Sequence, residues 1–186
     1  MRLTRDFVEF IECCARRDVS YLIVGYAVAA HGHPRATKDL DIWVLIEPAN
    51  AERLIGALND FGMGSVGLTA ADFLEPEVVV QLGYPPIRID LLTSIAGIAF
   101  SECWPRRVMI DVGGIEAGFI SAEDLITNKR AAGRPQDLVD ADILEQVAEE
   151  IIQEAFVSLY EDRSLVENPP AWLPYQGHIT PHQPLA

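Results

Sequence analysis

Long apolar runs and a secretory leader are both missing from this chain of 186 residues. No apolar stretch reaches the ~18 residues that cross a bilayer, so we expect no membrane span and no membrane partner. The first residues, Met1-Arg2-Leu3-Thr4-Arg5-Asp6, carry a charge every few positions and lack the apolar core of a signal peptide. Cysteine is scarce, and Cys13, Cys14 and Cys103 show no paired spacing, which predicts neither a disulfide framework nor a zinc site. These absences favour a cytoplasmic protein.

Basic residues are also in short supply. Lys and Arg total 14 against 28 Asp and Glu, which gives a formal net charge of −14. A protein that binds DNA without sequence preference usually has a basic surface, so generic DNA binding is not expected. A local basic patch could still attract RNA; its members would be Arg35, Lys38, Arg88, Lys129, Arg130 and Arg134.

Helical and strand-like apolar patterns are both present, which predicts a mixed α/β or α+β domain. Helices are expected after Thr4, over residues 27–31, 49–61 and 122–132, and from Pro135 for about 24 residues. Strands are expected over residues 21–24, 39–46, 78–82, 87–92, 108–112 and 115–120. The pairs 78–82 with 87–92 and 108–112 with 115–120 are expected to form hairpins.

No linker divides residues 1–162, so these are predicted to form one domain whose C-terminal helices start at about residue 121. Residues 163–186 are rich in proline and show no periodicity. An extended or disordered tail is expected there.

Acidic residues inside apolar strands are the most informative feature. Asp39 and Asp41 flank Leu40, and on a strand their side chains would share one face about 6.6 Å apart. Like charges this close repel by roughly 4 kcal/mol at an effective dielectric constant near 20. A divalent cation removes the conflict, and carboxylate oxygens suit Mg²⁺ or Mn²⁺. Asp90 is a third acid in an apolar strand, and three such carboxylates can hold two metal ions for phosphoryl or nucleotidyl transfer.

The order of these residues resembles the nucleotidyltransferase superfamily typified by DNA polymerase beta. That superfamily has a strand, a glycine turn, a short helix, an Asp-x-Asp strand and a later third Asp. Residues 24–32, 34–42 and 119–140 are similar to its small bacterial members, including the abortive-infection toxin type. The resemblance covers roughly residues 20–145, and it implies a mixed-sheet core with a helical C-terminal part.

The resemblance also implies roles for individual residues. Asp39, Asp41 and Asp90 match the metal ligands, and Asp90 would help to activate the attacking hydroxyl. Lys129 matches the helix lysine placed near the nucleotide phosphates, which makes it the fourth catalytic candidate. The expected nucleotide-binding residues are Gly25, Tyr26, Arg35, Thr37, Lys38, Lys129 and Asp137. One departure is Val24, which stands where the family usually has the first glycine of a pair, and a side chain there hinders close approach of the backbone to phosphate.

These observations predict transfer of a nucleotidyl group from a nucleoside triphosphate to a hydroxyl, with two Mg²⁺ or Mn²⁺ ions. The acceptor could be a protein side chain, a tRNA end or a small molecule, and a toxin-type enzyme would also have an antitoxin-like partner. Two alternatives remain open. One is a nucleotide-sugar glycosyltransferase with a metal-binding Asp-x-Asp, and the other is a non-catalytic partner-binding module of the same fold.

Ordinary structural explanations exist for the same residues. Lys129 could be an ordinary exposed helix lysine. If it contacts phosphate instead, its removal should weaken nucleotide binding by roughly 1–3 kcal/mol and barely change fold stability. Asp137 and Asp140 lie one helical turn apart and would stabilise a helix start through its dipole.

Overall fold

The computed structural model describes residues 4–32, 39–84 and 87–161, and of residues 87, 152 and 155–161 only the backbone. By its internal contacts the chain separates into two units, residues 1–147 and 148–186, which we describe one at a time. The predicted nucleotide-binding residues Arg35, Thr37 and Lys38 and the proline-rich tail lie outside the described residues, so the predictions made for them stay predictions.

A six-stranded mixed sheet with the order β3-β4-β2-β1-β6-β5 forms the centre of residues 1–147. Its strands are β1 (Tyr21–Ile23), β2 (Asp39–Val44), β3 (Val79–Tyr84), β4 (Ile87–Leu92), β5 (Val108–Asp111) and β6 (Glu116–Phe119). The pairs β1–β2, β3–β4 and β5–β6 are antiparallel, while β2–β4 and β1–β6 are parallel. The predicted mixed-sheet α+β fold is confirmed.

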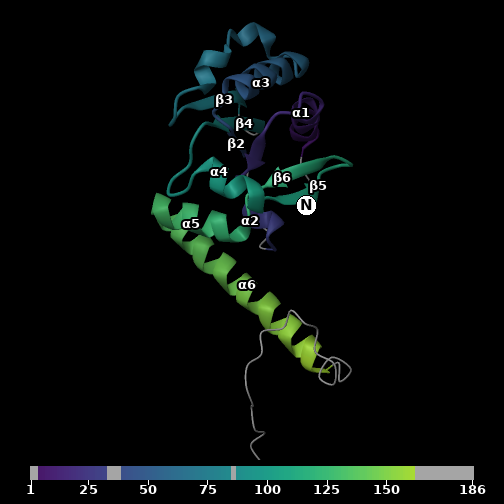
Figure 1. The fold of residues 1–186 in the computed structure, drawn as a ribbon, viewed down its shortest axis with the longest axis vertical. Helices are drawn as coiled ribbons and strands as arrows, with labels where there is room; N and C mark the ends of the chain where they lie inside the picture. The colour runs from purple at the N-terminus through teal and green to yellow at the C-terminus, as the bar shows by residue number, and fades with distance from the viewer. Residues whose placement is uncertain (1–3, 33–38, 85–86, 162–186) are drawn as a thin grey trace, which may run out of the picture. The chain divides into compact units, whose positions relative to one another are not determined.

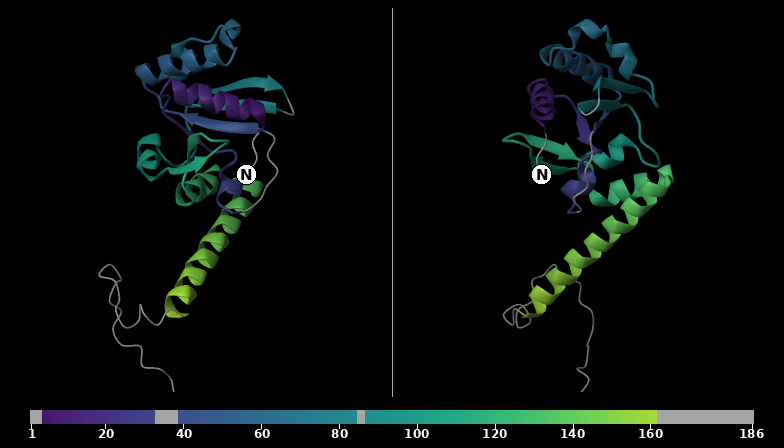
Figure 2. Two further views of the ribbon diagram at one scale, coloured as in Figure 1. Left: turned by 90° about the vertical axis from the view of Figure 1, so that its right-hand side faces the viewer. Right: turned by 180° about the vertical axis from the view of Figure 1, so that it is seen from behind.

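Helices cover both faces of this sheet, with α1 and α3 on one side and α2, α4 and α5 on the other (Figure 1, Figure 2). The α-helices are α1 (Arg5–Arg16), α2 (Ala27–Ala30), α3 (Pro48–Asp60), α4 (Phe100–Cys103), α5 (Ala122–Ala132) and α6 (Pro135–Glu161). Thr4 caps α1 as predicted, because its hydroxyl accepts a hydrogen bond from the Phe7 amide at 3.4 Å. α6 begins at Pro135 as predicted and runs for 27 residues.

Alternation along β2 sends its side chains to opposite faces of the sheet. Leu40 and Ile42 are fully buried, and they lie on the face opposite to that of Trp43. Trp43 lies on the other face, where its ring meets Phe100 of α4 edge-on with centroids 5.1 Å apart. Asp39 and Asp41 share this second face with Trp43, so the two acids face the α5 side of the sheet.

The structure departs from the sequence predictions at strand ends and in short helices. β2 ends at Val44 rather than at residue 46, because the Leu45 carbonyl accepts a hydrogen bond from the Asn50 side chain at 3.0 Å. β3 extends through Tyr84, into residues predicted to form a turn. The sequence patterns also missed four short helices: α4, η1 (Gly64–Val66), η2 (Ala70–Phe73) and η3 (Trp104–Arg106).

Two expectations from composition can be compared with the structure. Cys13, Cys14 and Cys103 are buried free thiols, which agrees with the prediction of no disulfide. In the described part of the chain, no helix combines the length and apolar character that a membrane crossing requires.

Candidate active site

The parallel pairing of β2 with β4 brings the three predicted acids together. Asp41 lies opposite Asp90, and Asp39 lies opposite Arg88, in the register of the two strands. Residues two apart on a strand point the same way, so all four side chains belong to one patch. We call Asp39, Asp41 and Asp90 the acidic cluster.

Arg88 lies within this cluster and neutralises part of its charge. Its guanidinium Nη2 donates to Asp39 Oδ2 at 2.8 Å and to Asp90 Oδ2 at 2.9 Å, and its Nε lies 2.8 Å from Asp90 Oδ1. The sequence interpretation placed Arg88 only in a surface basic patch and missed this role. The signal was the spacing Arg-x-Asp on a strand, which puts the base and Asp90 on one face.

Asp41 carries the charge that Arg88 compensates least. Its pKa is raised to about 6, first because the carboxyl is buried and then because Asp90 and Asp39 lie close to it. The positive charges of Arg88 and Arg134 oppose this rise. Asp41 therefore shifts towards the neutral form unless a further cation comes near.

Gly25 allows the loop after β1 to touch Asp41. The Val24 and Gly25 amides lie 2.9 and 3.3 Å from the Asp41 carbonyl oxygen and donate to it. A Cβ at Gly25 would stand 2.8 Å from both the amide nitrogen and Oδ2 of Asp41, which no side chain tolerates without a shift. The glycine at this position is thus explained by contact with Asp41, and its predicted contact with triphosphate stays a prediction.

Tyr26 follows Gly25 in the chain and is half-buried between the β1–α2 loop and α1. Its ring packs edge-on against Phe7 with centroids 5.9 Å apart. The pKa of the phenol is raised by burial and then by the charges of Asp39 and Asp41, so the ring lies within electrostatic reach of the acidic cluster.

A cavity of about 390 Å³ adjoins this patch. It brings together five predicted or charged residues from β2, the β1–α2 loop, α5 and the start of α6, namely Gly25, Asp41, Lys129, Arg134 and Asp137. Apolar side chains, including Val24, Val28, Leu92 and Leu125, line the rest. Asp39, Asp90 and Tyr26 are described residues that do not line the cavity.

Lys129 differs from the expected exposed helix lysine. It is 9% exposed, and its ammonium nitrogen lies 3.0 Å from Asp137 Oδ1 and 2.8 Å from Asp140 Oδ2. Asp140 is 1% exposed and also accepts from Gln136 at 3.2 Å. The structure contradicts an exposed helix lysine, and we expect removal of Lys129 to lower stability, because it breaks two ion pairs, one of them to a carboxylate that is 1% exposed.

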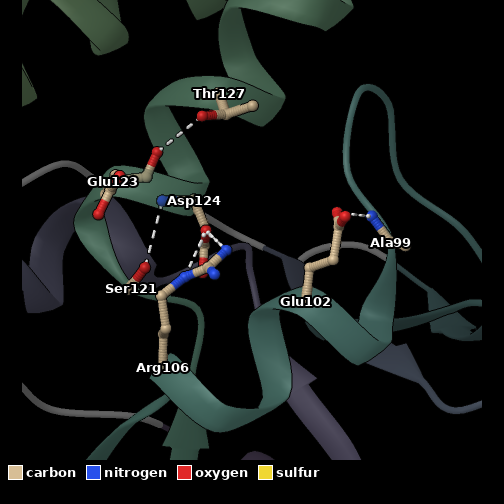
Figure 3. A network of polar contacts seen from close by, with 7 residues as sticks. All are labelled: Ala99, Glu102, Arg106, Ser121, Glu123, Asp124 and Thr127. Carbon is tan, nitrogen blue, oxygen red and sulfur yellow. Dashed lines mark hydrogen bonds and ion pairs between the residues drawn. The ribbon is translucent and has the colours of Figure 1, made fainter.

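The start of α5 is held by a second polar network (Figure 3). Asp124 is buried, its amide donates to the Ser121 hydroxyl at 3.2 Å, and its carboxylate accepts from Arg106 Nε at 3.2 Å. Arg106 belongs to η3, so this ion pair joins η3 to α5 across 18 residues of sequence. The network fixes the helix that carries Lys129.

The acidic cluster fits a divalent cation by its chemistry. Its three carboxylates are hard oxygen donors of the kind that Mg²⁺ and Mn²⁺ prefer, although Asp90 Oδ1 is already paired with Arg88 Nε at 2.8 Å. Among the described residues, however, no three Asp, Glu, His or Cys side chains are placed to hold a metal ion as they stand. The guanidinium of Arg88 bridges Asp39 and Asp90, so metal binding there requires Arg88 to release them.

Comparison with known protein families finds a family model that matches this chain. The model of a family described as "Nucleotidyl transferase of unknown function" (DUF2204) matches residues 4–170. No curated protein matches the chain. The matched span includes the acidic cluster, the cavity and α6, and it covers most of the chain. The protein is therefore a member of this nucleotidyl transferase family.

Proposed function

We propose that this chain transfers a nucleotidyl group from a nucleoside triphosphate to a hydroxyl acceptor, with divalent cations held by Asp39, Asp41 and Asp90. The observation that carries the proposal is the register of β2 and β4, which sets Asp41 beside Asp90 at the edge of a cavity. Family membership supports nucleotidyl transfer in general. The nucleoside triphosphate as donor and the use of two metal ions are part of our proposal.

In the proposed reaction the acceptor oxygen forms a bond to the α-phosphorus of the triphosphate. The bond from that phosphorus to the bridging oxygen breaks, and pyrophosphate leaves. Mg²⁺ or Mn²⁺, when bound, would neutralise the triphosphate and align the attacking hydroxyl. Asp90 is the proposed acceptor of the hydroxyl proton, as the resemblance implies.

Other residues of the chain would shape the site. Gly25 would let the β1–α2 loop lie directly against Asp41 and so hold that residue at the cavity, since a Cβ there would stand 2.8 Å from Asp41 Oδ2. Arg88 would hold the acidic cluster together until a metal ion replaces its charge. Asp124 and Arg106 would keep α5 in place during turnover.

The enzyme type, the protein partner and the location in the cell are proposed from the resemblance and from the composition. We propose an abortive-infection toxin type with an antitoxin-like partner, located in the cytoplasm. Protein side chains, tRNA ends and small molecules are the acceptor classes to test.

The proposal is tested by incubating the chain with Mg²⁺ or Mn²⁺ and each α-labelled nucleoside triphosphate, alone and with tRNA. We expect label on the chain, on the tRNA or on a small molecule, with release of pyrophosphate. Asp41→Asn should abolish labelling. Asp18→Asn is the matched control, because Asp18 is exposed at φ 53°, a conformation that asparagine adopts readily.

Absence of labelling with all four triphosphates would overturn the proposal. If the chain still binds nucleotide in that case, it is a non-catalytic module of this fold, to which the Val24 side chain in the cavity lining would contribute. Labelling that persists in Asp41→Asn would show that the activity lies elsewhere.

A further inference from the structure

The cavity beside Asp41 is lined by two cationic side chains, Lys129 and Arg134, and by two carboxylates, Asp41 and Asp137. A polyphosphate chain brings several negative charges, so it needs a cation whose donors are available to it. Lys129 and Arg134 differ in how far their donors are already paired within the protein.

Lys129 is already paired through its ammonium group with two carboxylates of the protein. Its side chain is 11% exposed, and its ammonium bonds Asp137 at 3.0 Å and Asp140 at 2.8 Å. Turning it towards a phosphate would break both ion pairs, one of them to a carboxylate that is 1% exposed. Breaking a buried ion pair in this way is strongly unfavourable.

Arg134 is free to meet a ligand. Its side chain is 81% exposed. Its Nε lies 3.7 Å from Asp137 Oδ2, a distance that is too long for a charge-assisted hydrogen bond. It lines the same cavity as Asp41, so a ligand bound there can contact both the guanidinium and the carboxylate that is proposed to bind metal.

The backbone around Arg134 is restricted even though its side chain is exposed. Gly133 before it ends α5 in the left-handed region, at φ 65°. Pro135 after it begins α6 and disfavours helical backbone at the preceding residue. This short connection thus holds the Cα of Arg134 at the cavity while its side chain can turn.

We propose that Arg134 is the residue that binds the phosphate chain of the nucleotide in this cavity, and that Lys129 is a positioning residue. The planar guanidinium presents paired N–H donors to two phosphate oxygens at once. Lys129 fixes Asp137 and Asp140, and so the start of α6 next to Arg134. This inference rests on the proposed function and names the cation that recognises its substrate.

The test uses inorganic tripolyphosphate as probe, which has the phosphate chain and no base or sugar. Binding to the full chain is measured by calorimetry in EDTA, and nucleoside triphosphate binding is measured in parallel with Mg²⁺. We expect Arg134→Ala to weaken tripolyphosphate binding by about tenfold or more, the usual effect of one charge-assisted contact. Arg134→Lys should keep part of the affinity.

Arg130→Ala is the matched control. Arg130 is also an exposed arginine of this region, but it pairs with Asp142 and Glu145 and does not line the cavity. We expect its loss to change the affinity by less than about twofold, since exposed charges outside the site act weakly. Lys129→Met should lower the melting temperature while changing the affinity of the folded protein less than Arg134→Ala does.

Equal affinity of Arg134→Ala and the parent would overturn the inference, as would an equal loss in Arg130→Ala. A parent that binds neither probe would also overturn it. Binding of tripolyphosphate that depends on Arg134, without transfer from any nucleoside triphosphate, would support the inference and overturn the proposed function. Transfer that continues unchanged in Arg134→Ala, at equal affinity, would overturn the inference alone.

Discussion

At the scale of single residues, Asp41 combines burial with two neighbouring carboxylates, and the protein must hold its negative charge at neutral pH. A carboxyl whose pKa rises from 3.8 to about 6 on folding makes the native state less stable as pH increases between these values. Below about pH 3 the group is protonated in both states and the cost disappears. Above pH 6 the full cost is present, which is roughly 3 kcal/mol at most.

Asp41→Asn removes this cost, so the metal-free variant should be more stable than the parent at pH 7 and equally stable at about pH 3. Urea unfolding of both proteins at several pH values measures the difference between their free energies of unfolding. The contributions of the other titrating groups are common to both proteins and cancel in this difference. Mn²⁺ should raise the melting temperature of the parent above pH 6 and leave the variant nearly unchanged. A variant less stable than the parent at pH 7 would instead show that the Asp41 carboxylate makes stabilising hydrogen bonds.

Arg88 occupies the acidic cluster, where we propose that a metal ion binds, and its guanidinium pairs with Asp39 and Asp90. Arg88→Gln keeps a polar side chain and removes the charge from Asp39 and Asp90, so the metal-free variant should melt at a lower temperature. Mn²⁺ should stabilise this variant more than it stabilises the parent, because the ion no longer competes with the guanidinium. Thermal melts with and without millimolar Mn²⁺ give both values, and an equal metal response in the two proteins would exclude competition.

At the scale of elements, the Lys129 network joins α5 to α6. Lys129→Met keeps the approximate length of the side chain and breaks the ion pair with the buried Asp140, which should cost about 3 kcal/mol of unfolding free energy. Asp140→Asn in the same chain should recover part of that loss, because it removes the buried negative charge that Lys129 compensates. A double-mutant cycle in urea measures the coupling, and strictly additive losses would show that the two side chains act independently.

At the scale of the whole molecule, residues 1–147 contain the complete sheet, the acidic cluster and the cavity. A chain that ends at Glu161 should therefore keep a cooperative thermal transition and the same response to Mn²⁺ as the full chain. The comparison needs only two proteins and one melting experiment each. Aggregation or a broad transition in the shorter chain would show that the proline-rich tail stabilises the fold.

Much of the local structure was predictable because its signals are local. Thr4 and Pro135 mark helix starts through their own hydrogen bonding and geometry, and Gly133 marks a helix end through its left-handed backbone. Helices of three or four residues, such as η1 and α4, are too short to show a period and were missed. The end of β2 was also missed, because it depends on a side chain from α3.

The sequence by itself determined which residues are acidic within apolar strands, and with them the nucleotidyl transferase family. Only the tertiary structure decided that β2 lies parallel to β4, which sets Asp41 opposite Asp90 and makes Arg88 the bridge between Asp39 and Asp90. It also decided that Lys129 is buried and that Arg134 is exposed at the cavity. The physical reason is that strand pairing joins segments far apart in the chain, such as Asp39 and Arg88 at a separation of 49 residues, while burial depends on which elements pack together; no local pattern of residues specifies either.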